Sequence, residues 1–84
     1  SDATIFPNPA SNAITLAIDL NQSANVTISI YDLTGKEVVF VPKQWLQSGT
    51  HNLEVNVDEL IQGLYVVKIN TGDNSITRKL FLVE

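Results

Sequence analysis

The side chains that could carry out chemistry in this chain are few and widely spaced. His51 is the single histidine and cysteine is absent, so a zinc site would have to combine carboxylates with one imidazole, and thiolate chemistry is excluded. A Ser-His-Asp triad would depend on the same imidazole, and no serine lies in the Gly-x-Ser-x-Gly setting that presents a nucleophile. We therefore expect His51 to begin a strand after Gly49-Thr50, and we predict no enzyme activity, no bound metal and no cofactor.

Two oxygen-rich pairs, Asp58-Glu59 and Asp73-Asn74, are the segments that could bind calcium. Neither has the spacing of an EF-hand loop. Asp and Asn are equally typical of β-turns, so we favour ordinary turns at both places.

Trp45 lies between Lys43-Gln44 and Leu46-Gln47. A Trp in a loop can present a flat apolar face to a sugar ring, but sugar-binding platforms usually combine two or three exposed aromatic residues, and no second one is near it in the sequence. We expect Trp45 to cap one end of the hydrophobic core, with carbohydrate binding as the alternative.

The length and charge of the chain limit its class and its partners. Its 84 residues allow one domain, residues 1–84. The net charge of −4 and the pI near 4.7 argue against binding to nucleic acid or to an anionic membrane surface, and no apolar run approaches the ~20 residues that cross a bilayer. Because methionine is absent, we expect the domain to be a piece of a longer protein.

Apolar and polar residues alternate along most of the chain, which is the pattern of strands that bury one face. The expected strands cover residues 14–20, 26–31, 36–41, 52–57, 63–69 and 75–83, with a short one near 4–6. We expect Pro42 to stop the strand over 36–41, residues 43–49 to form a loop, and residues 58–63 to cross between sheets. Seven short strands with turns about every 8–12 residues predict an all-β fold, a seven-stranded antiparallel immunoglobulin-like β-sandwich; a five- or six-stranded barrel would give similar spacing.

Prolines and glycines mark the positions where the backbone shape matters most. Pro7 and Pro9 flank Asn8 and are expected to hold the backbone extended, forming a rigid edge that blocks further strand pairing. Gly35 and Gly63 are placed where a turn or a close approach favours a positive φ.

Five segments occur in a characteristic order: Phe6-Pro7-Asn8-Pro9-Ala10, Tyr31-Asp32-Leu33-Thr34-Gly35-Lys36, Gly49-Thr50-His51, Leu60-Ile61-Gln62-Gly63-Leu64-Tyr65, and Thr77-Arg78-Lys79-Leu80. Together they resemble the type A C-terminal sorting domain of proteins exported by the type IX, or Por, secretion system of Bacteroidota. The acidic ending Val83-Glu84 departs from the pattern, because members of that family often finish on a basic or neutral residue.

The resemblance implies a non-catalytic address label. A cargo domain in the same polypeptide, N-terminal to this one, would cross the inner membrane by a signal peptide and reach the periplasm. The sorting domain would then direct it through the outer-membrane translocon. A sortase-like protease would commonly remove the domain, and the cargo would be secreted or attached to the cell surface, with no membrane insertion of the domain itself.

Three of the five basic residues (Lys68, Arg78 and Lys79) lie in the last 17 positions of an otherwise acidic chain. We expect them to form, with Leu80 and Val83, a recognition surface on the strands 63–69 and 75–83 that a carrier binds by charge complementarity or by strand addition. The alternatives are a passive immunoglobulin- or fibronectin-like spacer and a protein- or carbohydrate-binding module.

Overall fold

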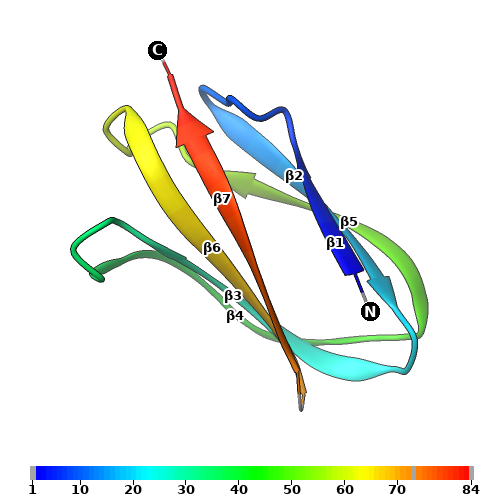
Figure 1. Ribbon diagram of the computed structural model, residues 1–84. Helices are drawn as coiled ribbons and strands as arrows, with labels where there is room; N and C mark the ends of the chain where they lie inside the picture. Colours follow the sequence, from blue (N-terminus) through cyan, green and yellow to red (C-terminus); the bar gives the residue numbers. More distant parts are fainter. Residues whose placement is uncertain (1, 73, 84) are drawn as a thin grey trace.

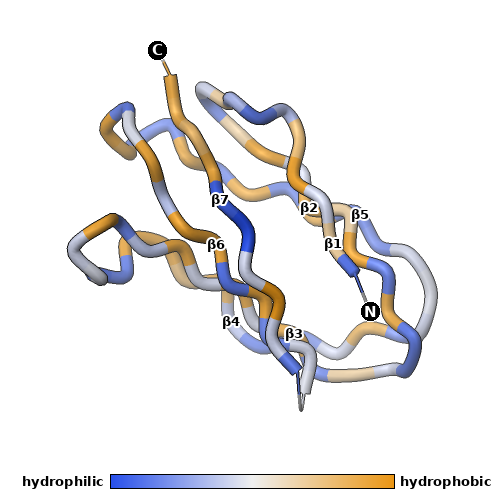
Figure 2. The backbone as a smooth tube through the Cα atoms, in the orientation of Figure 1, coloured by the Kyte–Doolittle hydropathy of each residue, from blue (hydrophilic) through white to orange (hydrophobic). Residues whose placement is uncertain are grey.

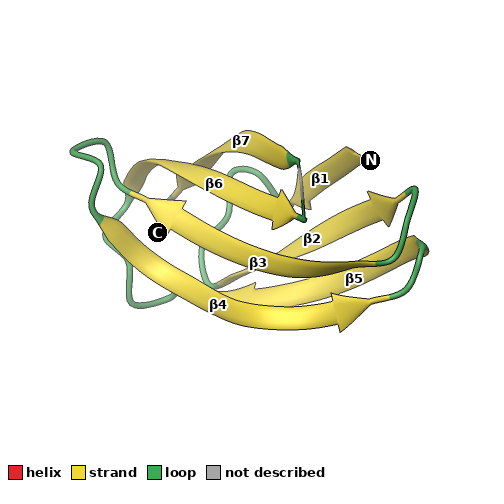
Figure 3. Ribbon diagram, turned by 90° about the horizontal axis from the view of Figure 1, so that it is seen from below, coloured by secondary structure: helices red, strands yellow, loops and turns green. Residues whose placement is uncertain are grey.

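The computed structural model describes residues 2–72 and 74–83, which form two antiparallel β-sheets packed face to face (Figures 1 and 3). The strands are β1 (Asp2–Phe6), β2 (Ala13–Leu20), β3 (Ala24–Tyr31), β4 (Glu37–Leu46), β5 (Gly49–Asn56), β6 (Gly63–Thr71) and β7 (Ser75–Leu82). One sheet has the order β1-β2-β5 and the other β4-β3-β6-β7. The predicted seven-stranded antiparallel sandwich is confirmed, and the two separate sheets exclude the barrel. Within the described ranges, no helix is long and apolar enough to cross a membrane.

The core lies between the sheets and is built from every second residue of each strand, because successive side chains point to opposite faces. β2 contributes Ile14, Leu16 and Ile18, and β3 contributes Ile28 and Ile30 from the opposite sheet, each at most 1% exposed. The backbone tube in Figure 2 alternates between hydrophobic and hydrophilic along these strands. This alternation buries one face of each sheet and leaves the other in water.

Three connections join neighbours within one sheet, and three cross from one sheet to the other. The predicted crossing at residues 58–63 is confirmed, since it links β5 of the three-stranded sheet to β6 of the four-stranded sheet. It ends at Gly63, whose φ of 148° is the positive value predicted for this position. The Tyr65 hydroxyl donates to the carbonyl of Ile61 at 2.6 Å, the arrangement of a tyrosine corner in immunoglobulin-like sandwiches.

The strand β4 corrects two sequence predictions. It does not stop at Pro42 but runs to Leu46, and only residues 47 and 48 separate it from β5, so the loop predicted for residues 43–49 is wrong. β4 is an edge strand, where proline is tolerated because no neighbour needs its missing N–H. The register also shifts here, with Val41 opposite Ile28 and Gln44 opposite Val26, so one extra residue is accommodated in a bulge.

Trp45 is the second correction at this strand. It does not cap the core, because it lies in β4 with 62% of its surface exposed. Its register partner is Asn25 in β3, which is also exposed. The indole therefore lies on the outer face of the four-stranded sheet.

Candidate recognition surface

The side chain of Asn8 occupies the free edge of β7. Its Nδ2 donates to the carbonyl of Lys79 and its Oδ1 accepts the N–H of Phe81, both at 3.0 Å. A primary amide offers a donor and an acceptor side by side, so it can pair with a strand edge as a peptide group would. The segment that carries Asn8 is bent, not extended as predicted, and the peptide bonds before Pro7 and Pro9 are both cis.

Ala10 continues this edge contact with its backbone. Its N–H donates to the carbonyl of Phe81 at 2.9 Å, and its carbonyl accepts the N–H of Val83 at 2.8 Å, as in a short parallel bridge to Leu82. Residues 8–10 thus take the place of a neighbouring strand. Because the polar groups of this part of the β7 edge are occupied, another chain cannot pair with it while the segment is in place.

Arg78 connects the other half of β7 to the beginning of the chain. Its Nε donates to the carbonyl of Ala3 at 3.0 Å, and its Nη2 forms an ion pair with Asp2 Oδ1 at 2.8 Å. The pKa of Asp2 is lowered from its ordinary value, mainly because the Ala3 N–H also donates to this oxygen, with Arg78 adding to the effect. Arg78 therefore holds β7 against β1 at the side of the sandwich.

The structure divides the residues predicted to form one recognition surface. Lys68 and Lys79 lie on the outer face of the four-stranded sheet, where Lys68 is opposite Thr77 and Lys79 is opposite Val66. Arg78 and Leu80 lie on the opposite face of β7, which looks toward the other sheet, and Leu80 is fully buried. These two residues therefore do not share the outer face with the lysines, because successive residues of a strand alternate between faces. Val83 follows β7 and is 44% exposed.

The outer face around these lysines also carries large apolar side chains that the sequence prediction did not include. Leu64 and Phe81 form a register pair, 36% and 52% exposed. Val66 lies between Tyr31 of β3 and Lys79 of β7. The signal in the sequence was the apolar residues at 64, 66 and 81, at positions where strict alternation would place polar ones.

The turn after β3 is held by its first residue. Gly35 has a φ of 90° and its N–H donates to the carbonyl of Asp32 at 3.0 Å, so the predicted turn and its glycine are confirmed. The Asp32 carboxylate accepts the Thr34 hydroxyl at 2.6 Å and the N–H groups of Thr34 and Lys36 at 2.9 and 3.0 Å. These hydrogen bonds, that of the Thr34 hydroxyl first, hold the pKa of Asp32 below its ordinary value. Asp32 therefore orders the hairpin between β3 and β4.

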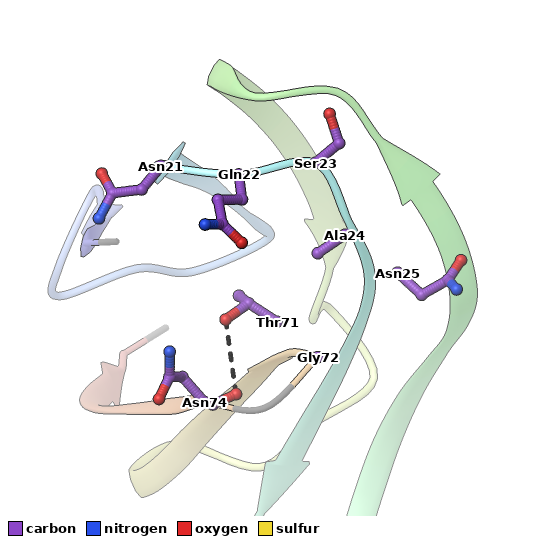
Figure 4. Close-up of a pocket in the computed structure, with 8 residues that line it drawn as sticks. All are labelled: Asn21, Gln22, Ser23, Ala24, Asn25, Thr71, Gly72 and Asn74. Carbon is purple, nitrogen blue, oxygen red and sulfur yellow. Dashed lines mark hydrogen bonds between the residues drawn. The ribbon is translucent and has the colours of Figure 1, made fainter.

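A hollow of the described surface lies at one end of the sandwich, between the β2–β3 connection and the end of β6 (Figure 4). Among the residues that the structure describes, its lining carries amide and hydroxyl groups and no ionisable side chain: Asn21, Gln22, Ser23, Ala24, Asn25, Thr71, Gly72 and Asn74. Figure 4 draws the Thr71 hydroxyl donating to the backbone carbonyl of Asn74. Amide and hydroxyl groups of this kind can hydrogen-bond a polar molecule.

The residues considered for metal binding are placed in ordinary structural roles. The His51 ring nitrogen Nε2 lies 2.6 Å from the carbonyl of Gln47, where the chain crosses from β4 to β5. The N–H of Asp58 donates to the side chain of Asn56, which is a turn contact. Asp73 lies outside the described residues. In the parts of the chain that the structure describes, no three His, Asp or Glu side chains gather as metal ligands would.

Comparison with known proteins agrees with the resemblance given by the order of motifs. The sequence model of the family described as the secretion system C-terminal sorting domain matches residues 4–83. An endo-acting ulvan lyase of Formosa agariphila is 30% identical over 84 residues, which are 100% of this chain and 15% of the lyase. The chain thus spans a small part of that relative's length. The match over nearly the whole chain places it in one family: it belongs to the secretion system C-terminal sorting domains, the signals that direct exported proteins.

Proposed function

We propose that the export machinery reads this domain as a folded surface and not as a linear C-terminal tail. The domain would carry a cargo, joined at its N-terminal side, from the periplasm through the outer-membrane translocon to the surface or the medium. Translocon and sortase-like components would be its partners, and the protease would remove it after passage. The relative that contains a similar segment is a much longer enzyme, which fits a small domain attached to a cargo.

The observation that carries this proposal is the way β7 is held. Its residues pair with β6 from Ser75 to Leu82, Asn8 and Ala10 occupy part of its other edge, and Arg78 ties it to β1. A receptor that needs residues 75–82 as an extended peptide would first have to break all these contacts. A receptor that reads the sandwich surface meets no such cost.

The test is a secretion assay in a host that has the type IX system. Residues 1–84 are fused behind a signal peptide and a fluorescent reporter, and the fraction of reporter outside the cell is measured in the parent strain and in a translocon-null strain. We expect external reporter in the parent and periplasmic reporter in the null strain. Reporter retained in both strains, with the domain shown to be folded, would overturn the sorting role in favour of a spacer.

A destabilised variant tests whether the folded state is what is read. Ile28→Asp places a charge in a position that is fully buried and should unfold the domain. We expect this fusion to remain inside the cell. Export at the parent level from an unfolded Ile28→Asp domain would show that a linear signal suffices and would refute the folded-surface proposal.

The exposure of Trp45 favours a second candidate function, carbohydrate binding. The indole is 62% exposed beside Asn25, and an exposed Trp next to an amide can stack on a sugar and hydrogen-bond its hydroxyls. Titration with neutral polysaccharides while following Trp fluorescence tests it. Quenching that Asn25→Ala weakens would support it, and an unchanged spectrum would exclude it.

A further inference from the structure

We propose that one end of the outer face of the four-stranded sheet docks a protein surface with an apolar centre and a rim of carboxylates. We name this surface the apolar–lysine patch, and its residues are Tyr31, Leu64, Val66, Lys68, Lys79 and Phe81. The inference rests on the proposed function, since the partner would be a component of the export machinery, and it adds which face is read and by what chemistry.

The strand register places these six residues together. Val66 has Tyr31 on one side and Lys79 on the other. Two residues earlier along β6, Leu64 is opposite Phe81. Side chains of directly opposed residues are about 5 Å apart at Cβ, and diagonal neighbours about 7–8 Å, so Leu64, Val66 and Phe81 form one continuous apolar area.

The two lysines border this area on the same face. Lys68 lies two residues beyond Val66 on β6, and Lys79 lies two residues before Phe81 on β7. Because Lys68 is opposite Thr77 and Lys79 is opposite Val66, the lysines are diagonal neighbours. The cationic border and the apolar area therefore form one surface, not two separate features.

On β3, β6 and β7 the rest of this outer face is polar, as the outer face of a two-layer sandwich is expected to be. The edge strand β4 adds two separate exposed aromatic side chains, Phe40 opposite Ser29 and Trp45 opposite Asn25. Thr27 and Asn70 are register partners joined by a hydrogen bond of 3.3 Å from the Asn70 amide to the Thr27 hydroxyl. Ser75 and Thr77 continue the polar area on β7. Folding does not require apolar residues at the end of this face that carries Leu64, Val66 and Phe81. Their grouping there therefore indicates a contact that covers them.

The charges around the patch favour an acidic partner over a second copy of the domain. Among the residues that the structure describes, the ion pair is that of Arg78 with Asp2, so neither Lys68 nor Lys79 is neutralised internally. Glu37, opposite Tyr31 at the β4 side, is an acidic residue bordering the patch. Packing two patches together would bring four lysines close to one another, and this like-charge contact would oppose self-association.

The two edges of the sheet are less suited to binding a partner by strand addition. Asn8 and Ala10 occupy half of the β7 edge. At the other edge, β4 contains Pro42 beside a register shift, and both features discourage pairing with a further strand. Of the surfaces of the four-stranded sheet, the outer face is thus the one that remains open for docking.

The test uses the secretion assay described above with matched variants. Lys68→Glu/Lys79→Glu reverses the charge of the patch, and Lys43→Glu/Gln47→Glu/Asn52→Asp makes the same change in net charge at exposed positions elsewhere. Phe81→Ser removes an apolar side chain from the patch, and Trp45→Ser removes an exposed aromatic outside it. All variants are first checked for an unchanged melting temperature.

We expect the two patch variants to lower the exported fraction about tenfold or more, the effect of losing one good interface contact, while the two control variants export normally. Equal export by patch and control variants would overturn the patch while leaving the sorting role intact. Failure of the unaltered domain to be exported would instead overturn the proposed function. A concentration-dependent dimer lost in Lys68→Glu/Lys79→Glu, or flotation with anionic vesicles lost in the same variant, would refute an acidic protein partner.

Discussion

Asn8 and Phe81, 73 residues apart in the sequence, are joined by a hydrogen bond from the Phe81 N–H to the Asn8 side-chain oxygen at 3.0 Å. The same amide donates to the carbonyl of Lys79. One side chain near the beginning of the chain thus satisfies two backbone groups of its last strand. The Pro-Asn-Pro motif has a physical role in this fold, which is to close an edge where another strand could otherwise add.

Replacing Asn8 tests this role. Asn8→Ala removes both hydrogen bonds to β7, and we expect a loss of about 1–2 kcal/mol in the free energy of unfolding, measured by urea denaturation. Amide hydrogen exchange at Phe81 should become faster, because its N–H loses its partner. Asn25→Ala is the control, since Asn25 is exposed and its change should stay within about 0.5 kcal/mol. Equal effects of the two substitutions would contradict the edge closure.

The sequence predicted the strands well wherever alternation marked a buried face. It failed at Pro42 and Trp45 because these depend on which strand lies at the sheet edge, and an edge is defined by pairing that the local pattern does not contain. That Arg78 and Lys79 point to opposite faces of β7 follows from the period of two in the sequence itself. By contrast, the closeness of Lys68 and Lys79 depends on the β6–β7 register, which turn geometry sets together with the hydrophobic pattern.

Acid should weaken the contribution of Asp32 to stability. Its folded-state pKa lies below the ordinary value of 3.8, first because of the Thr34 hydroxyl, so its contribution is fully present above about pH 5 and is lost as the pH falls through the folded pKa. In Asp32→Asn the position carries no titrating group. We expect the parent domain to exceed this variant in stability by more at about pH 7 than at about pH 3. A constant difference across that range, measured by urea denaturation, would contradict the assignment.

Arg78 should contribute more to stability than its acidic partner does. Arg78→Ala removes the ion pair with Asp2, the hydrogen bond to the Ala3 carbonyl and the packing of its aliphatic stem. Asp2→Ala removes only the exposed ion pair and a local hydrogen bond, and exposed pairs contribute little. We expect a larger fall in melting temperature for Arg78→Ala at both low and high salt. If high salt abolished the difference, the ion pair alone would account for the role of Arg78.

The hydroxyl of Tyr65 should stabilise the crossing from β5 to β6. Tyr65 is 7% exposed and its hydroxyl donates to the carbonyl of Ile61 at 2.6 Å. Tyr65→Phe leaves the ring in place and removes this bond, so we expect a loss of about 1 kcal/mol. Tyr31→Phe serves as the control, since no hydrogen bond of the Tyr31 hydroxyl occurs in the described structure and its removal should be nearly neutral. Thermal unfolding of both variants provides the comparison.

Lys79 and Leu80 are adjacent in the sequence, yet substitutions there should affect the domain in different ways. Leu80 is fully buried, so Leu80→Ala leaves a cavity and should cost about 2–5 kcal/mol; any loss of export would follow from unfolding. Lys79 is exposed on the outer face, so Lys79→Glu should change stability by less than about 0.5 kcal/mol and still lower export. Melting temperature and exported fraction, measured on the same fusions, separate the two effects. If Lys79→Glu lowered both quantities together, its role would be structural, and the recognition surface would have to lie elsewhere on the sandwich.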